Sequence, residues 1–165
     1  MTKILILSDT HSFLDKRIEK HIKSVNQVWH AGDIGSLETT DKISELKSLI
    51  GVHGNIDDHL IKREFPLNQI FKINGKKIVI THIAGYPNKY NFRALELIKE
   101  ENPDLFICGH SHILKIVYDK QFDHLHINPG AIGKKGFHTI QTAIKLTITK
   151  EGKFKDLEII ELTKI

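Results

Sequence analysis

The stretch KILILSDTHS (residues 3–12) combines a short apolar run with a group of polar side chains directly after it. An apolar run of this length, bounded by polar residues, is typical of a buried β-strand. In open α/β sheets, ligands bind at the carboxyl ends of the strands. Asp9 and His11 follow the run at once, so they are candidate functional residues. This one segment predicts both a first strand and the place of a site.

The same arrangement recurs four times, in HAGD (30–33), HGNID (53–57), TH (81–82) and GHSH (109–112). Together the five motifs supply seven candidate metal ligands: Asp9, His11, Asp33, Asn55, His82, His110 and His112. Carboxylate, imidazole and amide groups without thiolate suit Mn²⁺, Fe, Zn²⁺, Co²⁺ or Ni²⁺ better than they suit a structural zinc–cysteine site. We therefore expect two divalent ions that share a bridging ligand, a centre commonly used to hydrolyse phosphorus esters.

Each motif also has a structural interpretation when it is taken alone. Asp9 could cap a following helix, Asp33 and Asn55 could belong to plain turns, and His82 could be a hydrogen-bonded core histidine. Five such motifs at strand ends in one chain favour the metal site. The neighbouring glycines are Gly32, Gly54 and Gly109, and we expect them to allow sharp backbone turns beside the ligands.

The hydrophobic pattern predicts alternating strands and helices in the first part of the chain. Strands are expected at 3–8, 25–29 and 50–52, and helices at 13–22 and 37–49, where apolar residues recur at helical spacing. Strand and helix alternate three times, which is typical of parallel β-α-β units.

Beyond Pro66 the pattern predicts mostly strands. Asn74-Gly75 lies between apolar runs at 70–73 and 77–81 and indicates a hairpin. A helix around 94–98 is expected to end before Pro103, and a strand follows at 104–108. Two more hairpins are expected, pairing 113–118 with 124–127 and 143–149 with 154–161. No linker or repeat interrupts the pattern, so we expect a single α/β domain over residues 1–165, with a mixed sheet or two stacked sheets.

Composition narrows the class of protein. A chain of 165 residues can bury a sufficient core without disulfides. The one cysteine, Cys108, follows an apolar run, which indicates a buried, inert thiol and suits a reducing cytosol. No signal pattern occurs, and no apolar run approaches the roughly 20 residues that span a bilayer; we expect a cytoplasmic protein without a membrane partner. The net charge of +4 comes from dispersed lysines, which favours small anionic substrates over a specific nucleic-acid interface. A homo-oligomer remains open.

In their order, the motifs D-x-H, GD, GN, H and GHxH resemble those of the calcineurin-like metallophosphoesterase superfamily. The GNxD form at 54–57, the short chain and Asn128-Pro129-Gly130 are similar to its compact bacterial and archaeal phosphodiesterase branch, which is also related to a subunit of retromer, a protein-sorting coat. The resemblance runs from Asp9 to Gly130. It implies a four-layer α/β/β/α sandwich with two mixed sheets.

The resemblance also implies how the seven residues divide. One ion would be held by Asp9, His11, Asp33 and His112, and the other by Asp33, Asn55, His82 and His110, with Asp33 as the bridge. The implied activity is that of a metal-dependent phosphoesterase, with a phosphodiesterase favoured over a phosphatase. Hydroxide between the ions, with Mn²⁺ as the expected metal, would attack a small phosphorylated substrate, and Asp33, Asn55 and His82 are expected to carry catalysis. The alternative is a non-catalytic protein-interaction scaffold that keeps the fold; a nuclease is disfavoured because no basic groove is evident.

The sequence departs from the family pattern at Ile56, at Ala131, where relatives often have serine, and at Ile83, where relatives often have glycine. Ile56 occupies the position where larger members carry a histidine that is thought to protonate the leaving group. His30, His53 and His138 are the other candidates for that role, although a structural role is the favoured interpretation of each. Asn128 is expected to shape a loop. The polar segment 86–93 is long enough to reach over the metals, and its Asn91 and Arg93 are interpreted as solvated loop residues, with substrate contact as the alternative.

Overall fold

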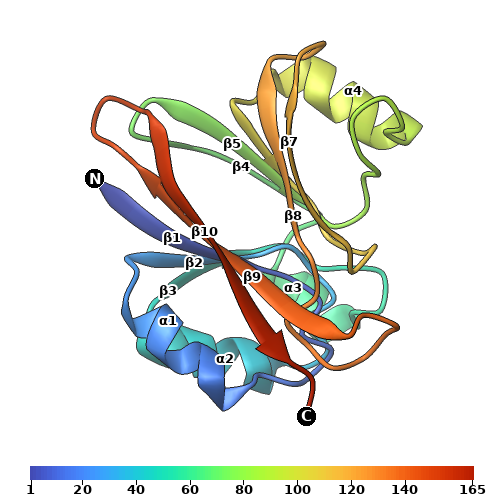
Figure 1. Cartoon of the computed structure of the whole chain (residues 1–165). Coiled ribbons are helices and arrows are strands. Elements are labelled where there is room, and N and C mark those ends of the chain that lie inside the picture. The colour runs from blue at the N-terminus through green and yellow to red at the C-terminus, as the bar shows by residue number, and fades with distance from the viewer.

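The computed structural model describes all 165 residues. Its ten strands and four α-helices follow one another along the chain as shown in Figure 1. The strands are β1 (Thr2–Leu7), β2 (Gln27–His30), β3 (Ser48–Gly51), β4 (Asn68–Ile73), β5 (Lys76–Thr81), β6 (Leu105–Ile107), β7 (Leu114–Asp119), β8 (His124–Pro129), β9 (Ile140–Ile148) and β10 (Phe154–Thr163). The helices are α1 (Glu19–Lys23), preceded by a 3₁₀ turn at Lys16–Ile18, α2 (Leu37–Leu46), α3 (His59–Glu64) and α4 (Phe92–Glu101).

The strands form two five-stranded mixed sheets. The first has the order β10-β9-β1-β2-β3, in which β1, β2 and β3 are parallel and β9 and β10 are antiparallel to their neighbours. The second has the order β4-β5-β6-β8-β7, in which β5, β6 and β8 are parallel and β4 and β7 run the other way. The predicted pair of mixed sheets is confirmed, and so are the three predicted hairpins.

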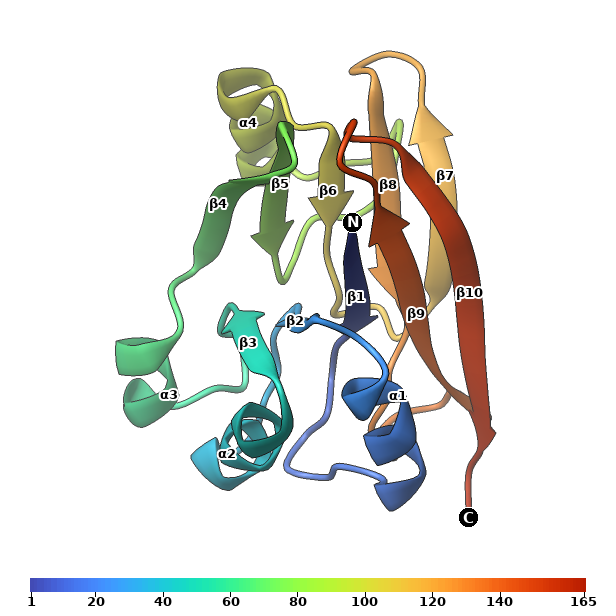
Figure 2. The same ribbon diagram turned by 90° about the vertical axis from the view of Figure 1, so that its left-hand side faces the viewer.

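Three apolar clusters hold the layers together. Between the sheets, Ile6 and Trp29 of the first sheet belong to one buried cluster with Ile80 and Ile107 of the second. A second cluster joins the outer face of the first sheet to α1 and α2, and a third joins the outer face of the second sheet to α4. Figure 2 shows α1 and α2 together at the end opposite α4. Burial of these faces removes apolar surface from water and produces the predicted α/β/β/α order.

Two predicted helices are shorter in the structure. Residues 13–22 were expected to be helical, but the helical structure begins only with the 3₁₀ turn at Lys16. Asp15 caps this turn, because its carboxylate accepts a hydrogen bond from the Arg17 amide. The predicted helix 37–49 ends at Leu46. Leu49 lies in β3, which begins at Ser48, two residues before the predicted strand start at 50. Leu46 and Leu49 pack against the same cluster. The apolar spacing therefore continues from the helix into the strand, and for this reason the predicted end of the helix was wrong.

Helix α3 was not predicted from the sequence. It has six residues, and Ile61 is the one buried among them, so no helical repeat of apolar residues marks it. Asp58 caps its start and accepts hydrogen bonds from the Leu60 and Ile61 amides. An aspartate at the N-cap position is a recognised signal of a helix start, and Asp58 could have indicated α3 from the sequence. No helix of the protein combines the length and the apolar character needed to cross a membrane.

Candidate metal centre

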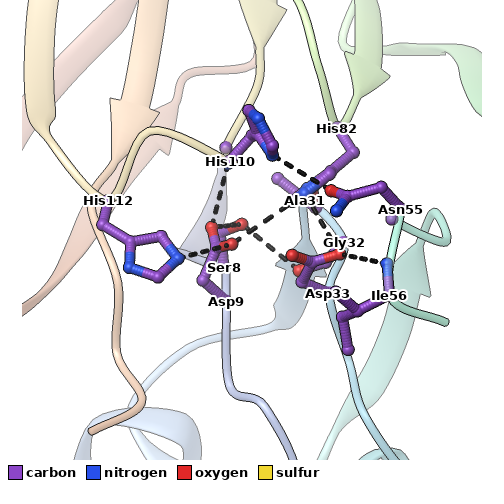
Figure 3. Close-up of polar contacts among 12 residues, drawn as sticks. Ser8, Asp9, Ala31, Gly32, Asp33, Asn55, Ile56, His82, His110 and His112 are labelled. Atoms are coloured by element: carbon purple, nitrogen blue, oxygen red, sulfur yellow. Dashed lines mark hydrogen bonds and ion pairs between the residues drawn. The ribbon is translucent and has the colours of Figure 1, made fainter. Parts of the chain in front are cut away.

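The carboxyl ends of the parallel strands of both sheets lie in one region of the molecule. Side chains that follow β1, β2 and β3 of the first sheet meet side chains that follow β5 and β6 of the second. All seven predicted residues come together there, namely Asp9, His11, Asp33, Asn55, His82, His110 and His112. Figure 3 shows six of them around a common space.

The first cluster consists of Asp9, His11 and His112, whose ligand atoms lie within 4.8 Å of one another. Asp9 Oδ1 lies 3.2 Å from His112 Nε2 and 3.7 Å from His11 Nε2. The other oxygen of the same carboxylate, Oδ2, accepts hydrogen bonds from the Ser8 hydroxyl at 2.6 Å and the His110 amide at 3.1 Å. The protein thus holds one oxygen of Asp9 in place and leaves the other to the cluster.

The second cluster consists of Asp33, His82 and His110, with Asn55 beside them. His82 Nε2 lies 3.2 Å from Asp33 Oδ1, and His82 Nδ1–H donates to the Ala31 carbonyl at 2.8 Å. That hydrogen bond orients the ring and turns Nε2 toward the cluster, as an outer partner of a metal-binding histidine does. His110 Nδ1 lies 3.0 Å from Asn55 Oδ1, about the separation of two adjacent ligands whose metal bonds are about 2.1 Å long.

Asp33 lies between the two clusters and faces each with a different oxygen. Its Oδ2 is 3.5 Å from His11 Nε2, and its Oδ1 is 3.2 Å from His82 Nε2. The Ile56 amide donates to Oδ1 at 3.2 Å and fixes the carboxylate plane. The carboxylate of Asp33 therefore presents one oxygen to each cluster.

Three buried atoms of the clusters have no hydrogen-bond partner: Asp9 Oδ1, His11 Nε2 and His82 Nε2. Such a group costs about 1–3 kcal/mol when it stays unpaired. All three are atoms that coordinate metals, and they converge on the same space. The residues present therefore fit divalent cations.

The electrostatics of the clusters also favour cations. Burial by itself would raise the pKa of Asp9, yet His11, His112 and His82 hold that pKa below its usual range. Burial opposes ionisation of Asp33 as well, and contact with His82 outweighs it and lowers the pKa of the carboxyl. For His82, burial would lower the pKa, but Asp33 and Asp9 raise it. Both carboxylates stay ionised, so a proton on His82 and a metal ion compete for the same place.

The backbone at this centre is strained. Five of the seven residues adopt positive φ angles: Asp9 57°, His11 45°, Asp33 53°, His110 71° and His112 62°. A non-glycine residue held in this region costs of the order of 1–3 kcal/mol, and such residues gather at functional sites. The strain is a property that the motifs alone did not predict, and it points independently to this region as the functional one.

The glycines next to the ligands have two different physical reasons. Gly32 has a φ of 102°, which confirms the turn predicted there. The sharp-turn explanation is wrong for Gly54 and Gly109, which do not have positive φ. At Gly54 a Cβ atom would collide with the carboxylate of Asp33, and at Gly109 it would lie 2.8 Å from Asp9 Oδ2. These two glycines are needed for close approach.

Asp57 is a buried residue of the site whose role sequence reasoning missed. Its carboxylate accepts hydrogen bonds from the amides of Gly54 at 2.7 Å, Gly35 at 2.8 Å and Ile34 at 3.1 Å. These bonds tie the loop after β2, which carries Asp33, to the loop after β3. Its place as the aspartate of the GNxD motif was the sequence signal that could have revealed this role. Asp57 holds together the two loops that carry Asp33 and Asn55.

Asn128 shapes the loop that carries the last two histidines, as expected. Its Nδ2 donates to the Gly109 carbonyl and to Ser111 Oγ, both at 3.0 Å, and its Oδ1 accepts from the Gly130 amide at 3.0 Å. The side chain thereby fixes the backbone between His110 and His112.

The three other histidines considered as proton donors each make a structural hydrogen bond. His30 is fully buried; Nδ1 accepts from the Gly32 amide, Nε2 bonds to Thr10, and burial lowers its pKa to about 4. His53 Nδ1 donates to the Phe65 carbonyl at 2.9 Å, and His138 Nε2 donates to the Gly133 carbonyl at 2.7 Å. The favoured structural interpretation agrees with these contacts.

The segment after His82 differs from its predicted role as a solvated loop. Asn91 caps α4, where its side chain accepts from the Ala94 amide at 2.8 Å. Arg93 belongs to the first turn of α4 and donates to oxygen atoms of Asn68, Thr81 and Ile83. Neither residue is a free loop residue, because the helix begins earlier than the apolar pattern indicates.

The fold and the paired clusters define a metal-binding protein of the α/β/β/α class. Residues 2–151 match the calcineurin-like phosphoesterase superfamily domain, and the chain belongs to this family. A probable metallophosphoesterase of Mycoplasma pneumoniae is 32% identical over 164 residues, covering 95% of this chain and 96% of that relative. A probable metallophosphoesterase of Methanocaldococcus jannaschii is 31% identical over 132 residues, which span 76% of this chain and 66% of that relative.

Solved structures show the same fold. The structure of an archaeal phosphodiesterase is 29% identical, with a TM-score of 0.69 over 97% of this chain and 99% of that one. Vps29 of Entamoeba histolytica, crystallised with Zn²⁺, is 18% identical, with a TM-score of 0.72 over 96% of this chain and 98% of that one. The predicted family is confirmed, and the family supports phosphoester hydrolysis with divalent metal ions.

Proposed function

We propose that the chain is a phosphodiesterase that uses two divalent ions to hydrolyse a small phosphorylated molecule. The observation that carries the proposal is the position of Asp33, which turns one carboxylate oxygen to each cluster. The ligands we assign to one ion are Asp9, His11, Asp33 and His112, and those assigned to the other are Asp33, Asn55, His82 and His110. Two such ions, when bound, would supply a hydroxide nucleophile near neutral pH and offset the charge of the phosphate.

The residues of the chain prepare the centre before substrate arrives. Asp9 and Asp33 stay ionised, and His82 is oriented by the Ala31 carbonyl. Asp57 and Asn128 hold the loops that carry the ligands, so little reorganisation accompanies metal binding. Oxygen and nitrogen ligands without thiolate suit Mn²⁺, which we propose as the working metal.

Ile56 follows Asn55 directly and is 46% exposed. Its alkyl side chain has no proton to give to a departing alcohol. Substrates whose leaving group is stable as an anion do not need that proton. Aryl esters are such substrates, so bis(p-nitrophenyl) phosphate is the appropriate first diester. A diester is also favoured by the likeness to the archaeal phosphodiesterase, the more similar in sequence of the two solved structures described above.

The test measures metal content and turnover on the same preparation. Full-length protein is loaded with Mn²⁺, Zn²⁺, Co²⁺, Ni²⁺ or Mg²⁺ and assayed with bis(p-nitrophenyl) phosphate and p-nitrophenyl phosphate. We expect about two ions per chain by elemental analysis and faster hydrolysis of the diester, with Mn²⁺ giving the highest rate. Absence of turnover with every metal would refute the enzyme, and a content of one ion would refute the paired centre.

The competing function is a protein-interaction scaffold that keeps the fold. The Vps29 structures, whose name refers to vacuolar protein sorting, share the fold at 16–18% identity and support this alternative. One of them holds Zn²⁺, so metal content alone does not separate the two functions. Turnover does, because a scaffold binds metal without hydrolysing the diester.

A further inference from the structure

A cavity of about 210 Å³ opens next to the second cluster. Asn55 and His82 form part of its wall, and Lys62 and Arg93 form another part. No carboxylate lines it. Pockets that enclose a whole drug-sized ligand have volumes of roughly 300–1,000 Å³, so this cavity suits one group of a substrate whose reacting part lies at the metal centre.

Arg93 is held rigidly in this wall. Its Nη1 donates to Asn68 Oδ1 at 3.1 Å, and its Nη2 donates to Thr81 Oγ1 at 2.8 Å and to the Ile83 carbonyl at 2.9 Å. All three acceptors are uncharged, and no carboxylate lies within 4 Å of the guanidinium. A guanidinium has five N–H donors. Two donors and the whole positive charge therefore remain for a ligand.

Lys62 adds a second cation from a different element, the last turn of α3. Its ammonium also makes no ion pair within 4 Å. His53 completes this side of the cavity, where its Nδ1 is bonded to the Phe65 carbonyl. Two positively charged residues without an acidic partner thus line one small cavity, whose wall also contains Asn55 and His82, two predicted ligands of the second ion.

We propose that this cavity binds a second phosphate group carried by the substrate. The inference rests on the proposed phosphodiesterase function and names its substrate class, a small molecule with a scissile phosphoester and a separate phosphate. Arginine and lysine are the residues that recognise phosphate, through charge-assisted hydrogen bonds. A rigid arginine loses little freedom on binding, which makes Arg93 the fixed donor and Lys62 the mobile one.

The experiment compares two substrates that differ by one phosphate. Thymidine 5′-(p-nitrophenyl phosphate) is assayed with and without a 3′-phosphate, and a 3′-O-carboxymethyl analogue shows whether a carboxylate serves equally. We expect wild-type kcat/KM to be about tenfold higher with the 3′-phosphate, and Lys62→Ala to reduce that preference about fivefold, which is the size of one exposed charge interaction. Lys62→Arg should keep the preference.

Lys23→Ala provides the matched control, since it removes the same charge from an exposed position of α1. It should leave the preference unchanged. Equal kcat/KM for the two substrates in wild type would overturn the inference, and so would an unchanged preference in Lys62→Ala. An equal loss on both substrates would overturn it as well, because Lys62 would then act on the scissile phosphate. A carboxylate analogue as good as the phosphate would reject phosphate as the specific group.

A binding measurement keeps the inference separate from catalysis. The full chain before metal loading is titrated with inorganic phosphate, and the Arg93 Nε–H resonance is followed by NMR. We expect a saturable shift in wild type, an apparent affinity about fivefold lower in Lys62→Ala, and no change in Lys23→Ala. If turnover fails but this shift occurs, the phosphodiesterase proposal fails and the anion site stands. If turnover succeeds and the shift does not occur in any variant, the anion site fails alone.

Discussion

Buried histidines of this protein lie both in the ligand set and outside it, and their contacts differ. At the centre, the Nε2 atoms of His11 and His82 have no hydrogen-bond partner. Outside the ligand set, His30 bonds through both ring nitrogens, and His126 contacts the Tyr90 hydroxyl at 2.8 Å and Cys108 Sγ at 3.8 Å. His124 Nδ1 also lacks a partner, but it belongs to neither cluster. The comparison teaches that an abundance of histidine marks no site by itself. Buried nitrogens that lack a partner and converge on one point do.

Charge separates the same two groups of histidines. Burial alone would lower the pKa of each buried histidine. Asp33 and Asp9 reverse that effect for His82 and raise its pKa, whereas His30 and His126 keep the lowered values, each to about 4. For His82 the nearby carboxylates outweigh burial, whereas for His30 burial outweighs Asp9, Asp57 and Asp33 and keeps the ring uncharged.

The largest expected effect is at the centre, where Asp33→Asn keeps the shape of the side chain and removes its charge. Loss of partners outside the ligand shell costs roughly 10–100-fold in metal affinity or activity, and loss of the bridging carboxylate should cost more. We expect at least one ion fewer per chain and turnover of bis(p-nitrophenyl) phosphate reduced by more than about 100-fold. Asp41→Asn on the exposed face of α2 is the control. Full activity in Asp33→Asn would disprove the assigned bridge.

The next effect is on stability and concerns a histidine outside the ligand set. The pKa of His30 is about 4 in the folded chain and about 6.5 in an unfolded one. Below pH 6.5 the unfolded state binds a proton that the folded state does not, so the free energy of unfolding falls as the pH drops from 6.5 to 4. The loss from His30 is about 3 kcal/mol.

Urea unfolding of wild type and His30→Gln, measured before metal loading between pH 7.5 and 4.5, checks the stability effect. The wild-type advantage over the variant should shrink as the pH falls, because glutamine does not titrate. Parallel stability profiles for the two proteins would show that His30 is not kept neutral by its surroundings.

A smaller effect is expected behind the centre, at Asn128, which touches no cluster atom but fixes the loop between His110 and His112. Asn128→Ala should weaken metal binding by roughly 10–100-fold, as measured by competition with a chromophoric chelator. Ser111→Ala, which removes one of the acceptors of Asn128, should have a lesser effect in the same direction. Wild-type affinity in Asn128→Ala would mean that the loop holds its shape without it.

The smallest effect is expected from Cys108, which lies next to His126, outside the ligand set. Burial raises the pKa of this thiol to about 12, so it is neither exposed nor ionised at pH 8. Native protein should not react with 5,5′-dithiobis(2-nitrobenzoate), and protein unfolded in urea should release one equivalent of chromophore. Rapid labelling of the native chain would show that His126 activates the thiol and that this region is not inert.

Much of the fold could be predicted because its signals are local. Apolar runs mark the strands, Asn74-Gly75 adopts positive φ at both positions as its hairpin requires, and Pro103 follows the end of α4. The failures occurred where a local pattern was ambiguous or too short. Leu49 lies at helical spacing from the apolar residues of α2 although it belongs to a strand, and α3 is too short to show a helical repeat of apolar residues.

Residue order along the chain determined which ligand types are available and that each follows a strand. It also determined the family, since the motifs D-x-H, GD, GN, H and GHxH can be read from the letters alone. The tertiary structure decided what those residues do to one another. His110 donates its amide to Asp9 across 101 positions of sequence, and Gly54 leaves room for Asp33. The positive φ angles, the clamp of Asp57 and the cavity between Lys62 and Arg93 arise in the same way. They depend on contacts between segments that meet only after the two sheets pack together, so no local pattern records them.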